Sequence, residues 1–316
     1  MSSILVTGAA GFIGSHTVEV LLAEGHQVWG ADNFRTGKAE WLAGALAHPA
    51  FELVEADVTA PQILTDLMRA HGVSVVIHLA ALVGVSESRA NPHLNQRINY
   101  EGTKLVHRAA RAAGVQRMVF ASSAAVYGVG CAGPWREDDV CAPVSPYGEA
   151  KLRAEEWLLA AGRNAGGPEV CCLRYFNVFG PRQDAQSPHS GVVSRFAASL
   201  RNGRAPLVNG DGSHTRDFIA VGDVARANLL AATAAGKVGG VFNICTGRRI
   251  SLNDLYALMS RVVGDAPPAV HGPPLNQDIP HSCGDPAKAA EQLGFVAETP
   301  LENAVAQLLG VMPARE

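Results

Sequence analysis

Two residues with complementary proton chemistry, Tyr147 and Lys151, stand four positions apart in the chain. In a helix this spacing places both side chains on one face, about one turn from each other. A phenol with a pKa near ~10 is a poor acid or base at neutral pH, and a nearby ammonium favours its ionised form. The pair therefore predicts a proton-transfer device. By itself the spacing is weak, because a half-buried tyrosine beside a solvated lysine gives the same pattern.

A glycine-rich turn near the start of the chain strengthens this interpretation. Residues 3–7 are expected to form a short apolar strand, and a helical apolar pattern follows the turn. Such a turn lets backbone approach a pyrophosphate, and the helix N-terminus offers free amide hydrogens. The glycines are spaced Gly-x-x-Gly-x-x-Gly, which departs from the common dinucleotide fingerprint. The residues expected to contact the phosphates are Gly8, Gly11, Phe12, Ile13 and Gly14.

The choice of dinucleotide depends on an aspartate at the end of the second predicted strand, residues 27–31. Asp32 follows Gly14 by eighteen residues, a position suited to holding the adenosine ribose hydroxyls and repelling a 2′-phosphate. This favours NAD over NADP, although Arg35 is near enough to meet a phosphate. A third strand, residues 51–56, leads to Asp57, which either meets the adenine edge or caps a turn.

In these motifs and others the chain resembles the extended short-chain dehydrogenase/reductases, and within them the nucleotide-sugar 4-epimerases. The resemblance covers nearly the whole chain. The matching segments are residues 7–16, 32–33, 57–58, 78–81, 99, 122–128, 147–151, 174–180 and 215–218.

The resemblance implies a role for each matching residue. Tyr147 would take the proton from a sugar hydroxyl while that carbon gives hydride to NAD, and Ser123 would hydrogen-bond the same oxygen. Lys151 would hold the nicotinamide ribose and lower the tyrosine pKa. For Ser123 the alternative is a strand-end hydroxyl that bonds backbone. The cofactor residues implied beyond the glycine turn are Asp32, Asn33, Asp57, Val58, Leu79, Ala80, Ala81, Asn99, Tyr147 and Lys151.

The substrate implied is a UDP-sugar. Arg216 is the candidate for gripping its phosphates, because a guanidinium offers paired donors, and a surface arginine is the alternative. In the segment that closes the nucleotide pocket the family places an arginine three residues before the aspartate that aligns with Asp278, and here that position is Leu275. The nucleotide grip is then weaker or supplied differently. The implied substrate residues are Ser123, Tyr147, Asn177, Val192, Arg216, Asp278 and Ser282.

The reaction implied is NAD-dependent 4-epimerisation through a transient 4-keto sugar. Related dehydratases and decarboxylases place carboxylates after the catalytic hydroxyl, where this chain has Ala124 and Ala125. A tyrosine at the position of Ser282 restricts the family's pocket to plain hexoses, so serine predicts that N-acetylated sugars are accepted alongside UDP-glucose and UDP-galactose. The alternatives are a UDP-glucuronate 4-epimerase, another nucleotide-sugar oxidoreductase, and a non-catalytic NAD-binding protein.

Composition bounds the class of protein. The chain has 316 residues, 47% of them hydrophobic and 17% charged, which suits an enclosed α/β core. A net charge of −3 provides no electrostatic footprint for nucleic acid. The first basic residue is Arg35, which argues against a basic targeting peptide, and no apolar run is long enough to span a bilayer. We therefore expect a soluble, cytoplasmic protein that binds neither nucleic acid nor membrane.

Cysteine and histidine spacings predict no metal site. The six cysteines lack a Cys-x-x-Cys pair, and Cys171 and Cys172 fall in a predicted buried strand, which favours reduced thiols. His78 stands in an apolar strand and is interpreted as a packed core histidine.

Alternating strands and helices predict the fold: a Rossmann doubly wound parallel sheet with a smaller C-terminal α/β substrate domain. Residues 1–175 are expected to form the NAD-binding domain, with 216–236 returning to it, and residues 176–215 and 237–316 the nucleotide-sugar domain. Helices are predicted near 12–24, 61–71, 95–113 and 147–164. The last two carry apolar side chains on more than one face, and the resemblance implies that they pair in a homodimer.

Overall fold

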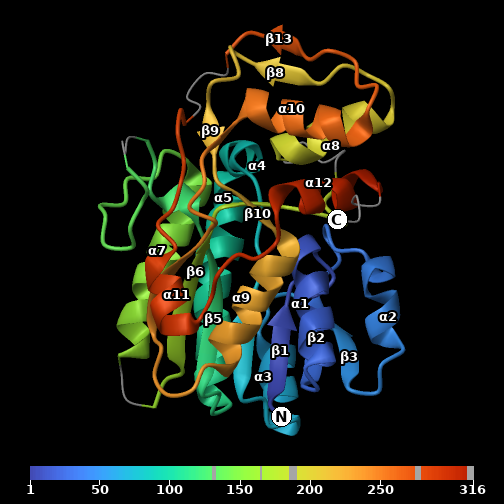
Figure 1. Cartoon of the computed structure of the whole chain (residues 1–316). Helices are drawn as coiled ribbons and strands as arrows, with labels where there is room; N and C mark the ends of the chain where they lie inside the picture. Colours follow the sequence, from blue (N-terminus) through green and yellow to red (C-terminus); the bar gives the residue numbers. More distant parts are fainter. Residues whose placement is uncertain (130–132, 164–165, 185–190, 275–278, 312–316) are drawn as a thin grey trace.

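Seven parallel strands form the central sheet, in the order β11-β6-β5-β4-β1-β2-β3 (Figure 1). The computed structural model describes residues 1–129, 133–163, 166–184, 191–274 and 279–311. The strands are β1 (Ser3–Thr7), β2 (Gln27–Asp32), β3 (Phe51–Glu55), β4 (Val75–His78), β5 (Arg117–Ser123), β6 (Glu169–Tyr175) and β11 (Gly240–Ile244). Strand order reverses between β1 and β4, which opens a crevice at their carboxyl ends. The predicted doubly wound sheet is confirmed.

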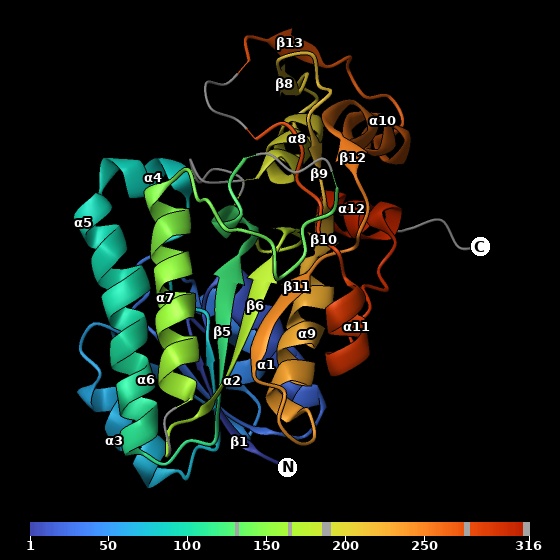
Figure 2. The same ribbon diagram turned by 90° about the vertical axis from the view of Figure 1, so that its left-hand side faces the viewer.

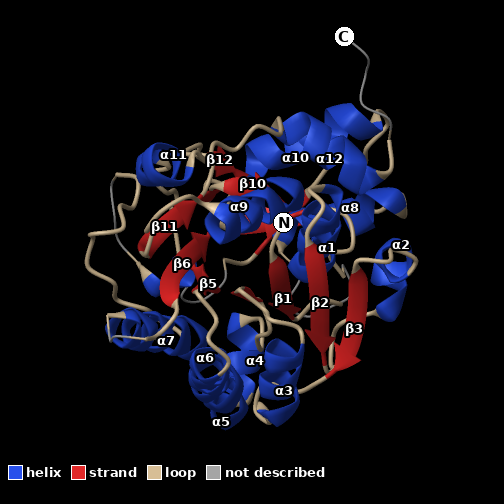
Figure 3. Cartoon of the chain, turned by 90° about the horizontal axis from the view of Figure 1, so that it is seen from below, coloured by secondary structure: helices blue, strands red, loops and turns tan. Residues whose placement is uncertain are grey.

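Helices cover both faces of this sheet (Figures 2 and 3). One face carries α3 (Gln62–Ala70), α6 (Thr103–Ala112) and α7 (Pro146–Gly162), and the other carries α1 (Phe12–Ala23), α9 (Val221–Thr233) and α11 (Ala287–Leu293). Short helical segments in the connections are η1 (Ala39–Leu42), α2 (Ala43–Leu46), α4 (Val85–Ala90), α5 (Pro92–Asn95), η2 (Gln96–Gly102) and η3 (Ala124–Val126).

Two apolar clusters hold the layers together. Successive side chains of a strand point to opposite faces, so Ile4 and Val6 of β1 join the cluster beneath α1 and α9, while Leu5 joins the one beneath α3, α6 and α7. All three residues are completely buried. A strand buried on both faces reads as a continuous apolar run, and this is why the central strands are visible in the sequence.

A smaller unit lies beyond the carboxyl ends of the strands (Figures 1 and 2). It contains three two-stranded pairs and three helices around a third apolar cluster. The pairs are β7 (Asn177–Phe179) with β10 (Phe218–Ala220), β8 (Leu207–Asn209) with β13 (Val270–Gly272), and β9 (Thr215–Arg216) with β12 (Ile250–Ser251). The helices are α8 (Val192–Arg201), α10 (Leu252–Val263) and α12 (Leu301–Leu309).

One predicted strand lies in a different layer from the one expected. The sequence places 237–316 wholly in the substrate domain, whereas β11 is the edge strand of the main sheet and pairs in parallel with β6. Phe242 and Ile244 are completely buried in the same apolar cluster as β1. A five-residue strand between loops carries no signal of which sheet it joins, because its partner is chosen by packing.

The helix predicted at 95–113 is continuous but irregular. Its first part, η2, has π-helical hydrogen bonding, and the regular helix α6 begins at Thr103. Such π-turns often occur at functional sites, and this one includes Asn99. None of the helices within the described ranges is long and apolar enough to cross a membrane.

His78 is a packed core histidine, as predicted. It is 1% exposed, with Nδ1 2.7 Å from the Thr7 hydroxyl and Nε2 3.1 Å from the Thr103 hydroxyl. The cysteines that the structure describes are also free thiols, and Cys171 and Cys172 are buried in β6. Across the described residues, no three His, Cys, Asp or Glu side chains group so that they could hold a metal ion.

Acid stability tests the environment of His78. Burial lowers the pKa of His78 from 6.5 to about 3, with a smaller effect of the nearby Lys151 charge. Between pH 6.5 and pH 3 this histidine is protonated in the unfolded chain but neutral in the folded chain. The free energy of unfolding therefore falls as pH drops from about 6.5 toward 3. His78→Gln should lower stability at neutral pH but make this fall shallower, measured by urea unfolding at a series of pH values. The exposed-site control His48→Gln should keep the wild-type slope, and an unchanged slope in His78→Gln would refute the account.

Candidate active site

The turn between β1 and α1 is packed so tightly that it requires glycine at two positions. Gly8 has φ +72°, and a Cβ there would lie 2.7 Å from the Ala80 nitrogen. A Cβ at Gly14 would lie 2.0 Å from the Gly8 carbonyl oxygen. Gly11 is the N-cap of α1 and donates its N–H to the Gly8 carbonyl at 3.1 Å. The close packing brings the helix N-terminus to the sheet edge, where free amide hydrogens can bind an anion.

A cavity of about 300 Å³ opens at this edge. All but one of the predicted cofactor residues line it, namely Gly8, Gly11, Phe12, Ile13, Gly14, Asp32, Asn33, Asp57, Val58, Leu79, Ala80, Ala81, Tyr147 and Lys151. They come from the ends of the four strands β1 to β4, from the start of α1 and from α7, so the parallel order of the sheet gathers them.

Asp32 closes one end of the cavity. Its carboxylate accepts hydrogen bonds from the Ala10 N–H at 2.9 Å and the Phe34 N–H at 2.8 Å. Burial nevertheless raises its pKa above the usual value. Because each carboxylate oxygen has two lone pairs, acceptor capacity remains for a ribose hydroxyl.

Asp57 caps a turn, one of the two roles considered for it, and its contact with the adenine edge stays a prediction. Its carboxylate accepts from the Thr59 N–H at 2.7 Å, which caps a turn, and from the Asn33 amide at 3.0 Å. Burial opposes ionisation, but these hydrogen bonds win and lower the pKa of Asp57. The aspartate also lines the cavity, beside Val58.

Asn99 is not among the residues that line the cavity, so its contact with the cofactor stays a prediction. Its side chain is 1% exposed, donates to the Leu82 carbonyl and accepts from the Leu82 N–H, both at 2.9 Å. It also donates to the Asn95 side chain. Because the Asn99 amide bonds both the N–H and the carbonyl of Leu82, it holds the loop after β4 in place. The same loop carries Leu79, Ala80 and Ala81, which line the cavity.

Tyr147 and Lys151 lie on the buried side of α7. Ser145 caps the helix by accepting from the Gly148 N–H at 3.1 Å, and Pro146 occupies its first turn. The Lys151 ammonium is 2% exposed, donates to the Ala121 carbonyl at 2.8 Å and lies 6.0 Å from the centre of the Tyr147 ring. The predicted one-turn spacing is confirmed.

The electrostatic effect differs from the one expected. Sequence reasoning has Lys151 lowering the pKa of Tyr147, but in the structure burial raises that pKa, and a hydrogen bond with Ser123 offsets it only in part. Burial also lowers the pKa of Lys151 to about 7. Both groups are therefore held close to their neutral forms.

The two adjacent serines at the end of β5 have separate partners. Ser123 hydrogen-bonds the Tyr147 side chain and also accepts from the Ala125 N–H at 3.2 Å, so the backbone contact considered for it is present. Its contact with the sugar oxygen stays a prediction. Ser122 lines the cavity, but its hydroxyl donates to Glu155 at 2.7 Å. Ser123 is thus the hydroxyl placed beside the tyrosine, as expected.

Apart from Ser123 and Tyr147, the predicted substrate residues that the structure describes lie in the smaller unit, outside the lining of the cavity. Arg216 is part-buried and donates to the Thr215 carbonyl at 2.9 Å and the Pro280 carbonyl at 3.4 Å. Ser282 is half-buried and donates its N–H to the Thr215 carbonyl at 3.1 Å, so 280–282 runs beside β9. The fold thus brings Arg216 and Ser282 together.

The other substrate residues are placed differently. Asn177 of β7 donates to the carbonyl of Asp217, the residue before β10, at 3.2 Å. Val192 begins α8 and packs against the third apolar cluster. Asp278 and Leu275 lie outside the described residues.

Comparison with known proteins identifies the family. The model of the NAD dependent epimerase/dehydratase family matches residues 4–245. This chain belongs to that family. It is 39% identical to the UDP-glucose 4-epimerase of Mycolicibacterium smegmatis over 306 residues, which cover 96% of each chain.

Solved structures extend the comparison. The UDP-N-acetylglucosamine 4-epimerase of Methanobrevibacter ruminantium, in complex with UDP-N-acetylmuramic acid, superimposes with a TM-score of 0.92 at 31% identity and covers 98% of this chain and 97% of its own. The UDP-glucose 4-epimerase of Thermus thermophilus, in complex with NAD, gives 0.88 at 32% identity and 98% coverage of both chains. The protein is therefore an NAD-dependent enzyme of the epimerase/dehydratase family.

The cavity of this epimerase-family chain fits a dinucleotide in one further respect, which sequence reasoning missed. Arg182 lines the cavity, has φ +65° and pairs with Glu19 of α1 at 2.5 Å. Its Nη1 is buried with no hydrogen-bond partner among residues placed by the structure. A buried donor in need of an acceptor suits the pyrophosphate. In the sequence, Arg182 follows Gly180-Pro181 and falls within the segment 176–215 that is expected to belong to the nucleotide-sugar domain, so no pattern indicates that it faces the dinucleotide.

The sequence does not indicate where the Arg35 side chain points, and in the structure it forms an ion pair with Glu87. Because Arg35 is paired with a carboxylate, we expect the preference between NAD and NADP to depend on Asp32. Wild type should bind NAD at least about tenfold more tightly than NADP in a direct titration, since a 2′-phosphate is repelled by Asp32.

Glu87→Gln releases Arg35 and should raise affinity for NADP more than affinity for NAD. Asp32→Asn likewise replaces a carboxylate with an amide, and it should reduce the preference for NAD over NADP more than Glu87→Gln does. Equal affinities of the wild type for the two cofactors would show that Asp32 does not discriminate.

Proposed function

We propose that this enzyme catalyses the NAD-dependent 4-epimerisation of UDP-sugars, interconverting UDP-GlcNAc with UDP-GalNAc and UDP-glucose with UDP-galactose through a transient 4-keto sugar. The observation that carries the proposal is that Tyr147 and Lys151 line the dinucleotide cavity together, with Ser123 hydrogen-bonded to Tyr147. The relatives named above support the UDP-sugar part of it.

The side chains divide the reaction between them. NAD, when bound, supplies the acceptor and later the donor of the hydride at carbon 4. The phenolate form of Tyr147, which burial makes the minor form, takes the proton of the 4-hydroxyl as the ketone forms, and the phenol so produced returns the proton when the alcohol is restored on the other face. Ser123 shares the same oxygen, and Lys151 orients the cofactor ribose.

Ala124 and Ala125 explain why the ketone is simply reduced again. They form the short helix η3, which Ser123 caps, and neither side chain can give or take a proton. Without an acid or base beside Ser123, elimination or decarboxylation lacks its second proton transfer. Return of the hydride after the sugar turns over is the route that remains.

We also propose that the chain forms a homodimer through η2, α6 and α7 and acts in the cytoplasm. Cations cover the aromatic rings of this helix layer: Lys104 lies 4.7 Å from the Tyr100 ring centre, and Arg108 lies 5.9 Å from that of Trp157. Aromatic and arginine side chains of this kind are enriched at protein interfaces.

The catalytic role of Tyr147 is tested by removing only its hydroxyl. Tyr147→Phe keeps the ring but not the titrating oxygen, so turnover of UDP-sugars should fall by about two or more orders of magnitude while NAD remains bound. Purified protein is assayed with UDP-glucose, UDP-galactose, UDP-GlcNAc, UDP-GalNAc and UDP-glucuronate, and products are resolved by NMR. A variant that turns over at the wild-type rate would remove Tyr147 from the mechanism, and turnover of UDP-glucuronate alone would favour the uronate epimerase.

The size of the sugar pocket is tested at Ser282. A serine leaves room for an acetamido group, and a bulky ring there would overpack the wall. Ser282→Tyr should lose activity on UDP-GlcNAc by at least about tenfold and keep activity on UDP-glucose. Equal losses on both sugars, or none on either, would mean that Ser282 is not the gate.

A further inference from the structure

A third residue on the buried face of α7 continues the spacing of the catalytic pair. Tyr147, Lys151 and Glu155 stand four apart, so they form one stripe along the helix. Glu155 is 2% exposed. It lies two turns from the tyrosine, too far to take part in the proton transfer itself.

Glu155 is bound from two neighbouring strands of the sheet. The Ser122 hydroxyl on β5 donates to Oε2 at 2.7 Å. Arg174 on β6 donates through Nε to Oε2 at 3.1 Å and through Nη2 to Oε1 at 2.5 Å. Ser122 and Arg174 are direct partners in the β5–β6 register, so one carboxylate fixes the helix to both strands.

Stability alone does not account for this buried ion pair. Removing two charges from water costs several kcal/mol per ion, and apolar side chains of similar volume often serve equally well. A bidentate ion pair instead fixes the relative orientation of its two side chains, because the planar guanidinium donates two parallel hydrogen bonds to the carboxylate. The residue after Ser122 is Ser123, the partner of Tyr147, so this orientation is fixed next to the catalytic hydroxyls.

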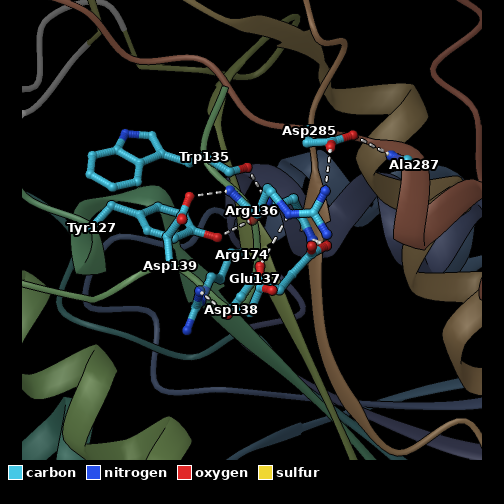
Figure 4. Close-up of polar contacts among 10 residues, drawn as sticks. Tyr127, Trp135, Arg136, Glu137, Asp138, Asp139, Arg174, Asp285 and Ala287 are labelled. Carbon is cyan, nitrogen blue, oxygen red and sulfur yellow. Dashed lines mark hydrogen bonds and ion pairs between the residues drawn. The ribbon is translucent and has the colours of Figure 1, made fainter. Parts of the chain in front are cut away.

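Arg174 also contacts the segment that contains Trp135 and Glu137, which Figure 4 shows together with Asp285. Arg174 Nη1 donates to the Glu137 carbonyl at 3.3 Å, and its guanidinium lies 4.7 Å from the centre of the Tyr127 ring. Two residues before Glu137, Trp135 donates to the Cys283 carbonyl at 2.8 Å and accepts from the Asp285 N–H at 2.8 Å. The segment so attached begins directly after Ser282.

We propose that Glu155, held by Ser122 and Arg174, is a positioning residue that fixes the rotation of α7 so that Tyr147 meets Ser123 and the sugar hydroxyl. The inference rests on the proposed epimerisation. The Tyr147 phenol projects away from the axis of α7, so a small rotation of the helix about this axis displaces the hydroxyl. A shift of about 1 Å at a reacting group can cost roughly 100-fold in rate.

The same two strands provide a matched control. Arg117 and Glu169 pair in the identical β5–β6 register at the opposite end of the strands, with Arg117 Nη2 2.8 Å from Glu169 Oε2. Glu169→Gln therefore breaks an ion pair between β5 and β6 without touching α7. It should leave turnover at the wild-type level.

The test measures kcat, KM and retained NAD for Glu155→Gln beside Glu169→Gln, with the purified holoenzyme and UDP-sugars. Glu155→Gln should lower kcat by at least about tenfold with KM within about threefold of wild type, and should shift the pH profile of kcat, since the Ser123–Tyr147 contact changes. Because Glu155→Gln leaves Arg174 buried and unpaired, the double variant Glu155→Leu/Arg174→Leu serves where the single one does not fold. The double variant should recover stability but keep the low kcat.

Wild-type kcat and pH profile in either Glu155 variant would overturn the positioning role, and so would an equal loss of kcat in Glu169→Gln. A wild-type enzyme that epimerises none of the UDP-sugars overturns the proposed function itself, and with it this inference. The two failures are told apart by the wild-type assay.

Discussion

The active site depends on one packing relation, the contact between the buried face of α7 and the carboxyl end of β5. That contact puts Tyr147 beside Ser123 and places the Lys151 ammonium on the Ala121 carbonyl. The parallel sheet brings the remaining cavity residues together, because the carboxyl ends of all its strands lie at the same edge. A helix packed on the same sheet in another rotation would keep the fold and lose the chemistry.

Burial determines the electrostatic state of the site. It raises the pKa of Tyr147 and lowers that of Lys151 to about 7, so neither group holds its charge easily. In so poorly solvated a place, charge that develops during reaction interacts strongly with nearby dipoles. Glu155 lies one turn beyond Lys151 on α7, and its charge is balanced by that of Arg174. Neither charge is among the causes of the pKa shift of Tyr147.

Much of this could be predicted from the sequence because it is local. The apolar runs of the central strands, the glycine turn and the Tyr147–Lys151 spacing are each written in consecutive residues, and each is confirmed. Ser123 could be separated from Ser122 only through the family resemblance. The structure supplies the reason, since Ser122 is engaged by Glu155.

What could not be predicted depends on partners distant in the chain. β11 looks like any short strand until Phe242 and Ile244 are seen inside the main core. The sequence predicts Asn99 as a cofactor residue but does not show that its amide binds the Leu82 backbone. It also does not show that Arg182 lies in the cavity wall with an Nη1 that has no hydrogen-bond partner among the described residues. The predicted effect of Lys151 on Tyr147 failed for the same reason: spacing gives proximity, whereas the degree of burial is set by the whole fold.

The central claim is that a hydride leaves carbon 4 of the sugar and returns to the same carbon. Epimerisation of UDP-GlcNAc carrying deuterium at carbon 4 tests this directly, with both epimers analysed by NMR and mass spectrometry after equilibration in ordinary water. We expect the deuterium to remain on carbon 4 of both UDP-GlcNAc and UDP-GalNAc. Loss of the label to solvent in step with epimerisation would contradict the account, because inversion would then proceed by proton exchange.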